Sequence, residues 1–167
     1  IMNSGCYDRD ISNILLSIKV LNKTNLEEIE IKKEEIDFYY RGTNIPNNFI
    51  ILSAKFEGTK GLKDEIEKTQ IDFIERKKLS QPSQIKTCGS TFKNISPDKK
   101  AWMLIKESGC AGFKEGDAEI SKKHCNFFVN NGKAKSSDIE NLILRVKKEV
   151  KNKTGINLDL EIKIIGD

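Results

Sequence analysis

A short polar linker, Ser80-Gln81-Pro82-Ser83, separates two halves of this chain that each carry their own apolar pattern. Proline lacks a backbone donor and has a fixed φ, and the flanking residues bury little apolar surface, so such a stretch favours a boundary between packed bodies. A chain of 167 residues is long enough for two small lobes. We therefore expect two domains, at residues 1–80 and 84–167.

The first half reads as strands followed by a helix. Alternating apolar residues predict an antiparallel hairpin from residues 14–21 and 28–31, and a further strand at 49–56. Helical spacing of apolar residues then predicts an amphipathic helix over 62–78. The strand positions expected to share inward faces are Leu16, Ile18, Val20, Ile50, Leu52, Ala54 and Phe56.

The second half predicts a small sheet under two helices. A first helix ends at Gly109, and a longer one runs from about Ser136 to Gly155 with a buried stripe. Short strands are expected at 118–120 and 126–129, and a final alternating strand at 157–165. The fold class is therefore α+β, with a C-terminal α/β sandwich built on a small, mostly antiparallel sheet and two main helices.

Composition narrows the class of protein. The net charge of +4 is uneven, because residues 84–167 carry 16 Lys and Arg and 11 Asp and Glu, while residues 1–83 carry 13 and 14. Those lysines are interleaved with acids, which favours a solvated face or an anionic small-molecule site over nucleic acid. No apolar run is long enough for a membrane helix. The four cysteines are widely spaced, which argues for reduced thiols and against a zinc site.

The stretch from Lys86 to Asn94 is the strongest candidate for chemistry. Gly89 permits a sharp turn, so that the hydroxyl of Ser90 is presented beside Lys93 and Asn94. Glycine, serine and threonine are also common in loops, and the segment alone is compatible with a turn that has no function.

Three other segments of the chain support a functional interpretation. Arg41 follows an aromatic run at a turn, where a guanidinium either meets an anion or stacks on the surface. His124 and Asn126 are two residues apart, so in a strand both side chains would project from the same face and could contact a ligand. The alternative is a histidine at the end of a strand whose hydrogen bonds are made within the protein. Glu161 lies in the middle of the predicted final strand, between apolar residues. It is either a carboxyl that holds or donates a proton or an exposed acid on an edge strand.

These residues resemble one family in order and approximate spacing, that of the UDP-N-acetylenolpyruvoylglucosamine reductases. The segments that carry the resemblance are Met2 to Tyr7, Tyr40-Arg41, Gly89 to Asn94, Ala101 to Ile105, Ser121 to Phe127 and Glu161 to Gly166. The resemblance extends over essentially the whole chain, and it is to the form of the family with a short Tyr-Arg region.

The resemblance implies a bacterial cytoplasmic flavoenzyme of peptidoglycan precursor synthesis. NADPH would reduce FAD, and the flavin would reduce UDP-N-acetylglucosamine enolpyruvate to UDP-N-acetylmuramate. It further implies a monomer with no membrane, nucleic-acid or metal partner. Two readings outside that activity stay open, a truncated non-catalytic fragment and a basic nucleic-acid-binding module.

The resemblance also implies roles for individual residues. Ser90 would be the proton donor, and Arg41 and Glu161 would stabilise the charge that develops on the substrate. The remaining implied contacts are with the UDP-sugar at Lys78, Asn94, His124 and Tyr40, and with FAD at Gly5 and Tyr7.

The sequence departs from the family pattern at three positions and over one region. Ile95 stands where proline is common, Asp117 follows Gly116 where a second glycine is usual, and Asp8 replaces a glycine. The family's glycine-rich N-terminal half, which holds most of the FAD, is not among these residues. We therefore expect residues 1–80 to be the C-terminal part of an FAD-binding domain, and residues 84–167 to be the UDP-sugar domain.

Overall fold

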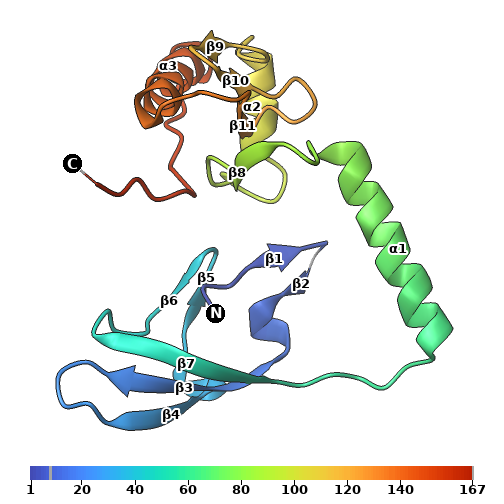
Figure 1. Ribbon diagram of the computed structural model, residues 1–167, viewed down its shortest axis with the longest axis vertical. Coiled ribbons are helices and arrows are strands. Elements are labelled where there is room, and N and C mark those ends of the chain that lie inside the picture. Colours follow the sequence, from blue (N-terminus) through green and yellow to red (C-terminus); the bar gives the residue numbers. More distant parts are fainter. Residues whose placement is uncertain (8, 167) are drawn as a thin grey trace. The chain divides into compact units, whose positions relative to one another are not determined.

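The computed structural model describes residues 1–7 and 9–166 and divides into two compact units, Ile1–Leu62 and Lys63–Asp167 (Figure 1). Each unit has its own buried core. This division groups the helix before the polar linker with the second half, and the predicted domains at 1–80 and 84–167 stay a prediction. Asp8, one of the departures from the family pattern, lies outside the described residues.

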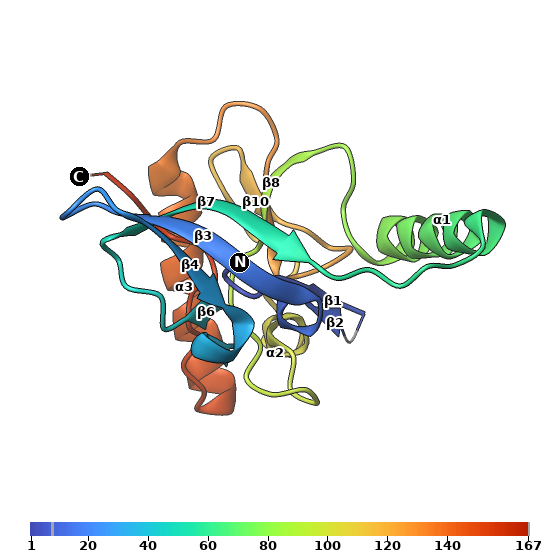
Figure 2. The same cartoon turned by 90° about the horizontal axis from the view of Figure 1, so that it is seen from below.

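The first unit is built on a three-stranded antiparallel sheet in the order β4-β3-β7, whose strands run side by side (Figures 1 and 2). Its strands are β3 (Leu15–Asn22), β4 (Glu28–Lys32) and β7 (Phe49–Phe56). The hairpin and the third strand expected from sequence are therefore confirmed. Short two-stranded ribbons and single 3₁₀ turns complete the unit: β1 (Gly5–Cys6), β2 (Arg9–Asp10), β5 (Phe38–Tyr39), β6 (Gly42–Thr43), η1 (Ile11–Asn13) and η2 (Lys33–Glu35).

Register shifts change which residues of this sheet point inward. Pairing of β3 with β7 shifts between Leu15 and Ser17 and again between Lys19 and Val20. Because a slip of one residue moves a side chain to the other face, the expected inward position of Leu16 is wrong, and Leu16 is 47% exposed.

The same shifts alter strand β7. Ile50, Leu52 and Phe56 were expected to share an inward face with Ala54, and all three are exposed. The β7 residues that pack on the core of this unit are Phe49, Ile51 and Ala54. The strand was predictable from its alternation, but its packed face was not.

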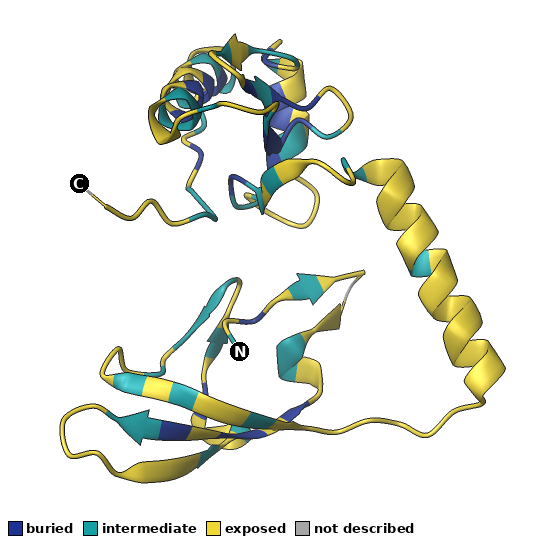
Figure 3. Cartoon of the chain, viewed as in Figure 1, coloured by how far each residue is buried: buried dark blue, intermediate teal, exposed yellow. Residues whose placement is uncertain are grey.

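Helix α1 (Lys63–Ser80) confirms the predicted helix but not a buried stripe. None of its residues is buried, and Ile66 and Ile74 are about half exposed. Figure 3 shows the helix in the colour of exposed residues over nearly its whole length. Within the described part of the chain, no helix is long and apolar enough to cross a membrane.

The second unit is a four-stranded antiparallel sheet in the order β8-β11-β10-β9, with two helices that pack on it and on each other. The elements are β8 (Lys86–Ser90), α2 (Ala101–Glu107), β9 (Lys114–Glu115), β10 (Ala118–Ile120), β11 (Phe127–Asn130) and α3 (Ser136–Thr154). This is the small antiparallel sheet with two main helices that the sequence predicts.

Helix α3 supplies the largest part of the core. Its buried residues recur at helical spacing, and they meet Phe92, Leu104 and Ile120 from the rest of the unit. The helix ends at Gly155, which adopts a left-handed φ of 74° and donates its N–H to the carbonyl of Lys151 at 2.8 Å. The buried residues of the helix are Leu142, Ile143, Val146 and Val150.

The predicted final strand at 157–165 is wrong as a regular strand. Leu160 forms only an isolated antiparallel bridge with Phe92, and Ile164 is 52% exposed. Leu158 is fully buried, and the partly buried Leu160 and Ile162 pack against the same core. The alternation thus indicated the packed side of this segment but overestimated the length of the pairing.

The helix offers a matched pair for a test of this core. Leu142→Ala removes a fully buried side chain, and Leu144→Ala changes the same residue type two positions along, where it is 66% exposed. We expect Leu142→Ala to lower the free energy of unfolding by about 2 to 5 kcal/mol. Leu144→Ala should stay within about 0.5 kcal/mol of the parent. Urea denaturation followed by circular dichroism measures both, and equal losses would contradict the described orientation of α3.

Candidate active site

Ser90 lies at the end of edge strand β8, where the backbone turns. Gly89 has a φ of +82°, a left-handed conformation that residues with a Cβ adopt rarely. Apart from its two chain neighbours, no atom of the described residues lies within 4 Å of the position that a Cβ on Gly89 would take, so the glycine is favoured by its torsion and not by lack of space. The half-buried Ser90 then pairs in register with Phe127 of β11.

Two backbone hydrogen bonds bring Glu161 to the same place. The N–H of Glu161 donates to the carbonyl of Thr91 at 2.9 Å, and the N–H of Lys93 donates to the carbonyl of Asp159 at 2.8 Å. These bonds flank the bridge between residues 92 and 160. Ser90 and Glu161, far apart in sequence, are therefore held on adjacent segments of the second unit.

Asn126 is not a ligand edge, as its strand parity with the histidine had suggested. It is 3% exposed, and its side-chain amide clamps Phe92. The oxygen accepts from the N–H of Phe92 at 2.9 Å and the nitrogen donates to its carbonyl at 2.8 Å. A buried amide is stable only when both ends are paired, so Asn126 is a structural substitute for a strand neighbour.

Asn94 holds the start of helix α2. Its side-chain oxygen accepts the N–H of Ala101, the first residue of that helix, at 3.1 Å. This bond satisfies one of the donors that every helix start leaves open. Asn94 is thus fixed in orientation four residues after Ser90.

His124 sits in an aromatic cluster with Trp102 and Phe127. Its ring centroid lies 6.1 Å from that of Trp102 and 4.7 Å from that of Phe127. Burial lowers the pKa of His124, because the charged imidazolium loses hydration there. The Nδ1 atom is buried and has no hydrogen-bond partner within the described residues. Trp102 is half-buried beside it.

Lys78 lies near the end of α1, where Lys123 reaches it. The ammonium of Lys123 donates to the carbonyl of Lys78, and a cavity of about 260 Å³ lies beside Lys78 and Pro82. Lys123 carried no motif of its own, and only its position next to the histidine could have drawn attention to it. The Lys123 side chain is thus held against the backbone near the end of α1.

The predicted site residues of the first unit form a separate group. The Arg41 guanidinium donates to the carbonyls of Asn3 and Tyr40 at 2.9 and 2.8 Å, and it lies 4.5 Å from the Tyr40 ring centroid. It also lies 4.0 Å from a carboxylate oxygen of Asp10. Arg41 therefore ties the β1–β2 ribbon to the β5–β6 ribbon, which is a structural role within that unit.

Gly5 and Tyr7, the predicted FAD contacts, belong to the first unit, and their role toward a flavin stays a prediction. A Cβ at Gly5 would lie 1.7 Å from a carboxylate oxygen of Asp10, so the glycine is explained by contact with this chain's own ribbon. Tyr7 has a left-handed φ of 52° and is 38% exposed. Among the described residues, no group of three His, Cys, Asp or Glu is placed to hold a metal ion.

Two departures from the family pattern have local explanations. The N–H of Ile95 donates to the carbonyl of Lys99 at 3.1 Å, a bond that a proline could not make. The carboxylate of Asp117 accepts the N–H of Lys133 at 2.9 Å, and its carbonyl accepts the N–H of Asn131. Both substitutions are thus used to close surface turns.

Fold and site together define an α+β protein in which a serine and a glutamate lie on adjacent segments at one edge of a small antiparallel sheet. Residues 81–165 match the family described as UDP-N-acetylenolpyruvoylglucosamine reductase, C-terminal domain. The chain belongs to the UDP-N-acetylenolpyruvoylglucosamine reductase family.

Individual relatives agree with that assignment. The chain is 44% identical over 166 residues to the UDP-N-acetylenolpyruvoylglucosamine reductase of Pelagibacter ubique, covering 98% of this chain and 55% of that protein. It is 41% identical over 165 residues to the enzyme of the same name from Wolbachia pipientis, covering 99% of this chain and 56% of that protein.

A crystal structure supports the same family assignment. The reductase of Thermus caldophilus is similar with a TM-score of 0.84 and 31% identity, over 97% of this chain and 57% of the crystallised chain. The present chain thus spans about half the length of the relatives it matches.

The histidine gives a direct test of the described packing. His124 is the only histidine in the chain, so its NMR titration is free of overlap. We expect its pKa below the usual value of about 6.5, and Trp102→Ala should raise it by admitting water. Met103→Ala, on the exposed neighbour, should leave it unchanged.

The lowered pKa of His124 also determines how its contribution to stability depends on pH. With the folded pKa lowered, the contribution of His124 to stability is complete above the unfolded pKa and is lost as pH falls through the folded pKa. A titration that stays at the ordinary value in the parent chain would contradict the burial of the imidazole.

Proposed function

We propose that this chain provides the UDP-sugar lobe and the reacting side chains of a reductase that converts UDP-N-acetylglucosamine enolpyruvate to UDP-N-acetylmuramate in the bacterial cytoplasm. The observation that supports it most is the pairing of the Thr91 and Glu161 segments next to Ser90. FAD, reduced by NADPH, would supply the hydride when bound, and the rest of the proposal concerns this chain's own residues.

Ser90 would deliver the proton. Addition of hydride to the vinyl carbon leaves a basic carbon beside the carboxylate, and a hydroxyl held at hydrogen-bond distance can protonate it even though an alcohol is a weak acid. The kink at Gly89 directs this serine, and its pairing with Phe127 limits its freedom. A donor fixed in this way needs little reorganisation when charge develops.

Arg41 and Glu161 would act on the developing charge. The carboxyl of Glu161 would meet the substrate from the segment beside Ser90, and the guanidinium of Arg41 would offer its planar donors to the substrate carboxylate. Arg41 is oriented by the carbonyls of Asn3 and Tyr40, so its plane is set before any substrate binds.

Four further side chains would contact the UDP portion. Lys78 suits a phosphate as a point charge, Asn94 is oriented by the start of α2, and His124 presents a largely neutral ring near neutral pH. Tyr40, whose ring is 44% exposed, completes the proposed set from the first unit. NADPH would be a second substrate, and we propose a monomer.

A non-catalytic fragment is the second candidate, and one observation favours it. Helix α1 exposes Ile66, Ile71 and Ile74. Apolar side chains exposed together on one element mark a surface that packs against another part of a protein. A nucleic-acid module is less consistent with the structure, because Phe92 and Phe128 are buried in the core instead of forming an exposed stacking face.

Binding of the nucleotide sugar tests the role of Lys78. We expect Lys78→Ala to weaken binding of UDP-N-acetylglucosamine enolpyruvate by about tenfold, since a charge-assisted contact with a phosphate is lost. Lys68→Ala, on the same helix and exposed, is the matched control and should bind like the parent. Isothermal titration calorimetry measures both affinities. Equal affinity of all three chains would remove Lys78 from the site.

Turnover tests the role of Ser90. With FAD, NADPH and the enolpyruvyl sugar present, we expect Ser90→Ala to lower kcat by about 10² to 10⁴-fold, the range for loss of a general acid. Ser137→Ala, an exposed serine of α3, is the control. NADPH oxidation and product formation are followed together. A parent chain without flavin absorbance or turnover would instead support the non-catalytic fragment.

A further inference from the structure

A second cavity in the C-terminal unit lies outside the proposed catalytic groups. Its volume is about 400 Å³, and it opens between edge strand β8, strand β11, the first turn of α3 and the C-terminal segment. That volume lies within the range of small-molecule sites in proteins. Its apolar walls come from Phe128, Ala134, Ile139 and Ile162.

This cavity faces away from Ser90 and Glu161. Ser90 pairs with Phe127, whereas the cavity is lined by the next residue, Phe128, whose side chain leaves the opposite face of the strand. In the same way Ile162 lines the cavity and follows Glu161 directly. The cavity is therefore separate from the proposed substrate face, although Thr91 and Ser90 are consecutive residues.

The polar groups at this cavity are cationic or neutral. Lys86 and Lys135 lie at its rim, and Ser136 begins helix α3. The N-terminus of that helix is already capped by Asp138, whose carboxylate accepts the N–H of Lys135 at 2.8 Å, and Asp138 does not line the cavity. The same carboxylate lies against Gly116.

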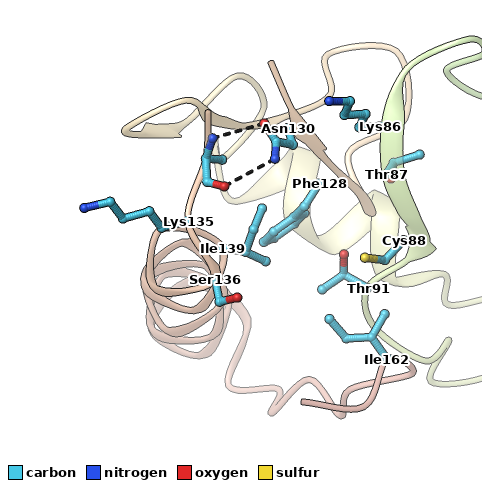
Figure 4. A pocket seen from close by; sticks show the side chains of 11 residues that line it. Lys86, Thr87, Cys88, Thr91, Phe128, Asn130, Lys135, Ser136, Ile139 and Ile162 are labelled. Carbon is cyan, nitrogen blue, oxygen red and sulfur yellow. Dashed lines mark hydrogen bonds between the residues drawn. The ribbon is translucent and has the colours of Figure 1, made fainter. Parts of the chain in front are cut away.

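The interior of the cavity is shaped by rigid groups. The side chain of Asn130 exchanges two hydrogen bonds with the backbone of Ala134, at 3.3 and 3.1 Å, and thereby fixes one wall (Figure 4). Figure 4 shows the thiol of Cys88 and the hydroxyl of Thr91 directed into the space that Phe128 and Ile162 border. Lys135 extends outward from the mouth, where a lysine can turn over a bound anion.

We propose that this cavity binds a small amphipathic carboxylate, with its apolar group on the Phe128, Ile139 and Ile162 floor and its charge at the Lys86 and Lys135 rim. The apolar floor excludes a purely ionic ligand such as free phosphate as the preferred occupant, since burying charge against it would be costly. The cationic rim, in turn, disfavours a neutral hydrocarbon over an acid of the same size.

The chain contains its own reporter and its own control for this proposal. Cys88 is an exposed thiol that lines the cavity, and Cys6 is an exposed thiol in the other unit. Cys110 and Cys125 are buried; burial raises the pKa of both thiols, that of Cys110 to about 11, so they react slowly. Alkylation at Cys88 therefore reports occupancy of the cavity.

The experiment measures alkylation of the full chain by iodoacetamide, resolved by peptide mass spectrometry, with 4-phenylbutyrate as the probe. We expect saturating probe to slow modification of Cys88 by about fivefold or more, because bound ligand blocks access to the thiolate, and to leave Cys6 unchanged. The neutral 4-phenylbutanamide should require about a tenfold higher concentration to give the same protection of Cys88.

Variants separate the two parts of the proposed site. Lys86→Glu combined with Lys135→Glu should raise the protecting concentration of 4-phenylbutyrate by about tenfold, and Lys148→Glu, elsewhere on α3, should not. Ile139→Trp should fill the cavity and abolish protection, with its fold checked by circular dichroism. If that variant fails to fold, the charge variants still decide.

Three results would overturn the proposal. The first is an unchanged rate at Cys88 with millimolar probe, and the second is equal protection of Cys6 and Cys88. The third is equal protection by the amide, which would show that the rim does not select an anion. Selective, charge-dependent protection of Cys88 supports it.

Discussion

The backbone bonds between residues 91–93 and 159–161 are the interaction on which the C-terminal unit depends. They attach the last described segment to the end of β8, and they do so with only one bridged residue pair between them. The buried Asn126 takes part as well, since it pairs both backbone groups of Phe92 from the other side. Phe92, which is fully buried, is thus held by hydrogen bonds along both edges as well as by packing.

This arrangement explains why the proposed site sits where it does. A serine at the end of a free edge strand would be mobile, but here the following three residues are fixed by a segment 70 positions later. The helix start at Ala101 is tied to Asn94, so the loop after the serine is fixed at its far end also. Stability and the orientation of the candidate groups therefore come from the same bonds.

The amino-acid sequence predicted the elements of this protein better than their faces. Alternation placed strands β3, β4 and β7, and helical spacing with Gly155 as terminator placed α3. Leu16 and Leu52 were misplaced because bulges are set by pairing between strands, which local alternation does not encode. The final strand failed for a related reason, since pairing partners decide whether an extended segment becomes a strand.

The candidate site shows a similar division. Ser90 and Glu161 were singled out by residue type and setting, and the structure places their segments together. Asn126 and His124 are two residues apart, yet the Asn126 amide hydrogen-bonds the backbone of the core, whereas His124 belongs to an aromatic cluster. This distinction depends on tertiary burial, which the spacing alone does not show. Lys123 and the cavity behind β8 were missed because each is formed by residues that are ordinary in isolation. The exposed residues of α1 show the converse case, in which a correctly predicted helix buries none of its residues.

Gly89 illustrates a constraint of handedness. Since open space surrounds the place where a side chain would begin, the position rejects ordinary amino acids only through their chirality. A mirror-image alanine, introduced by chemical ligation, has its favoured torsions at positive φ and would meet no neighbour there. The bend ahead of the serine thus favours the one achiral residue that ribosomal synthesis supplies, and a synthetic mirror-image residue could add a substituent at this point of the chain without opposing its torsion.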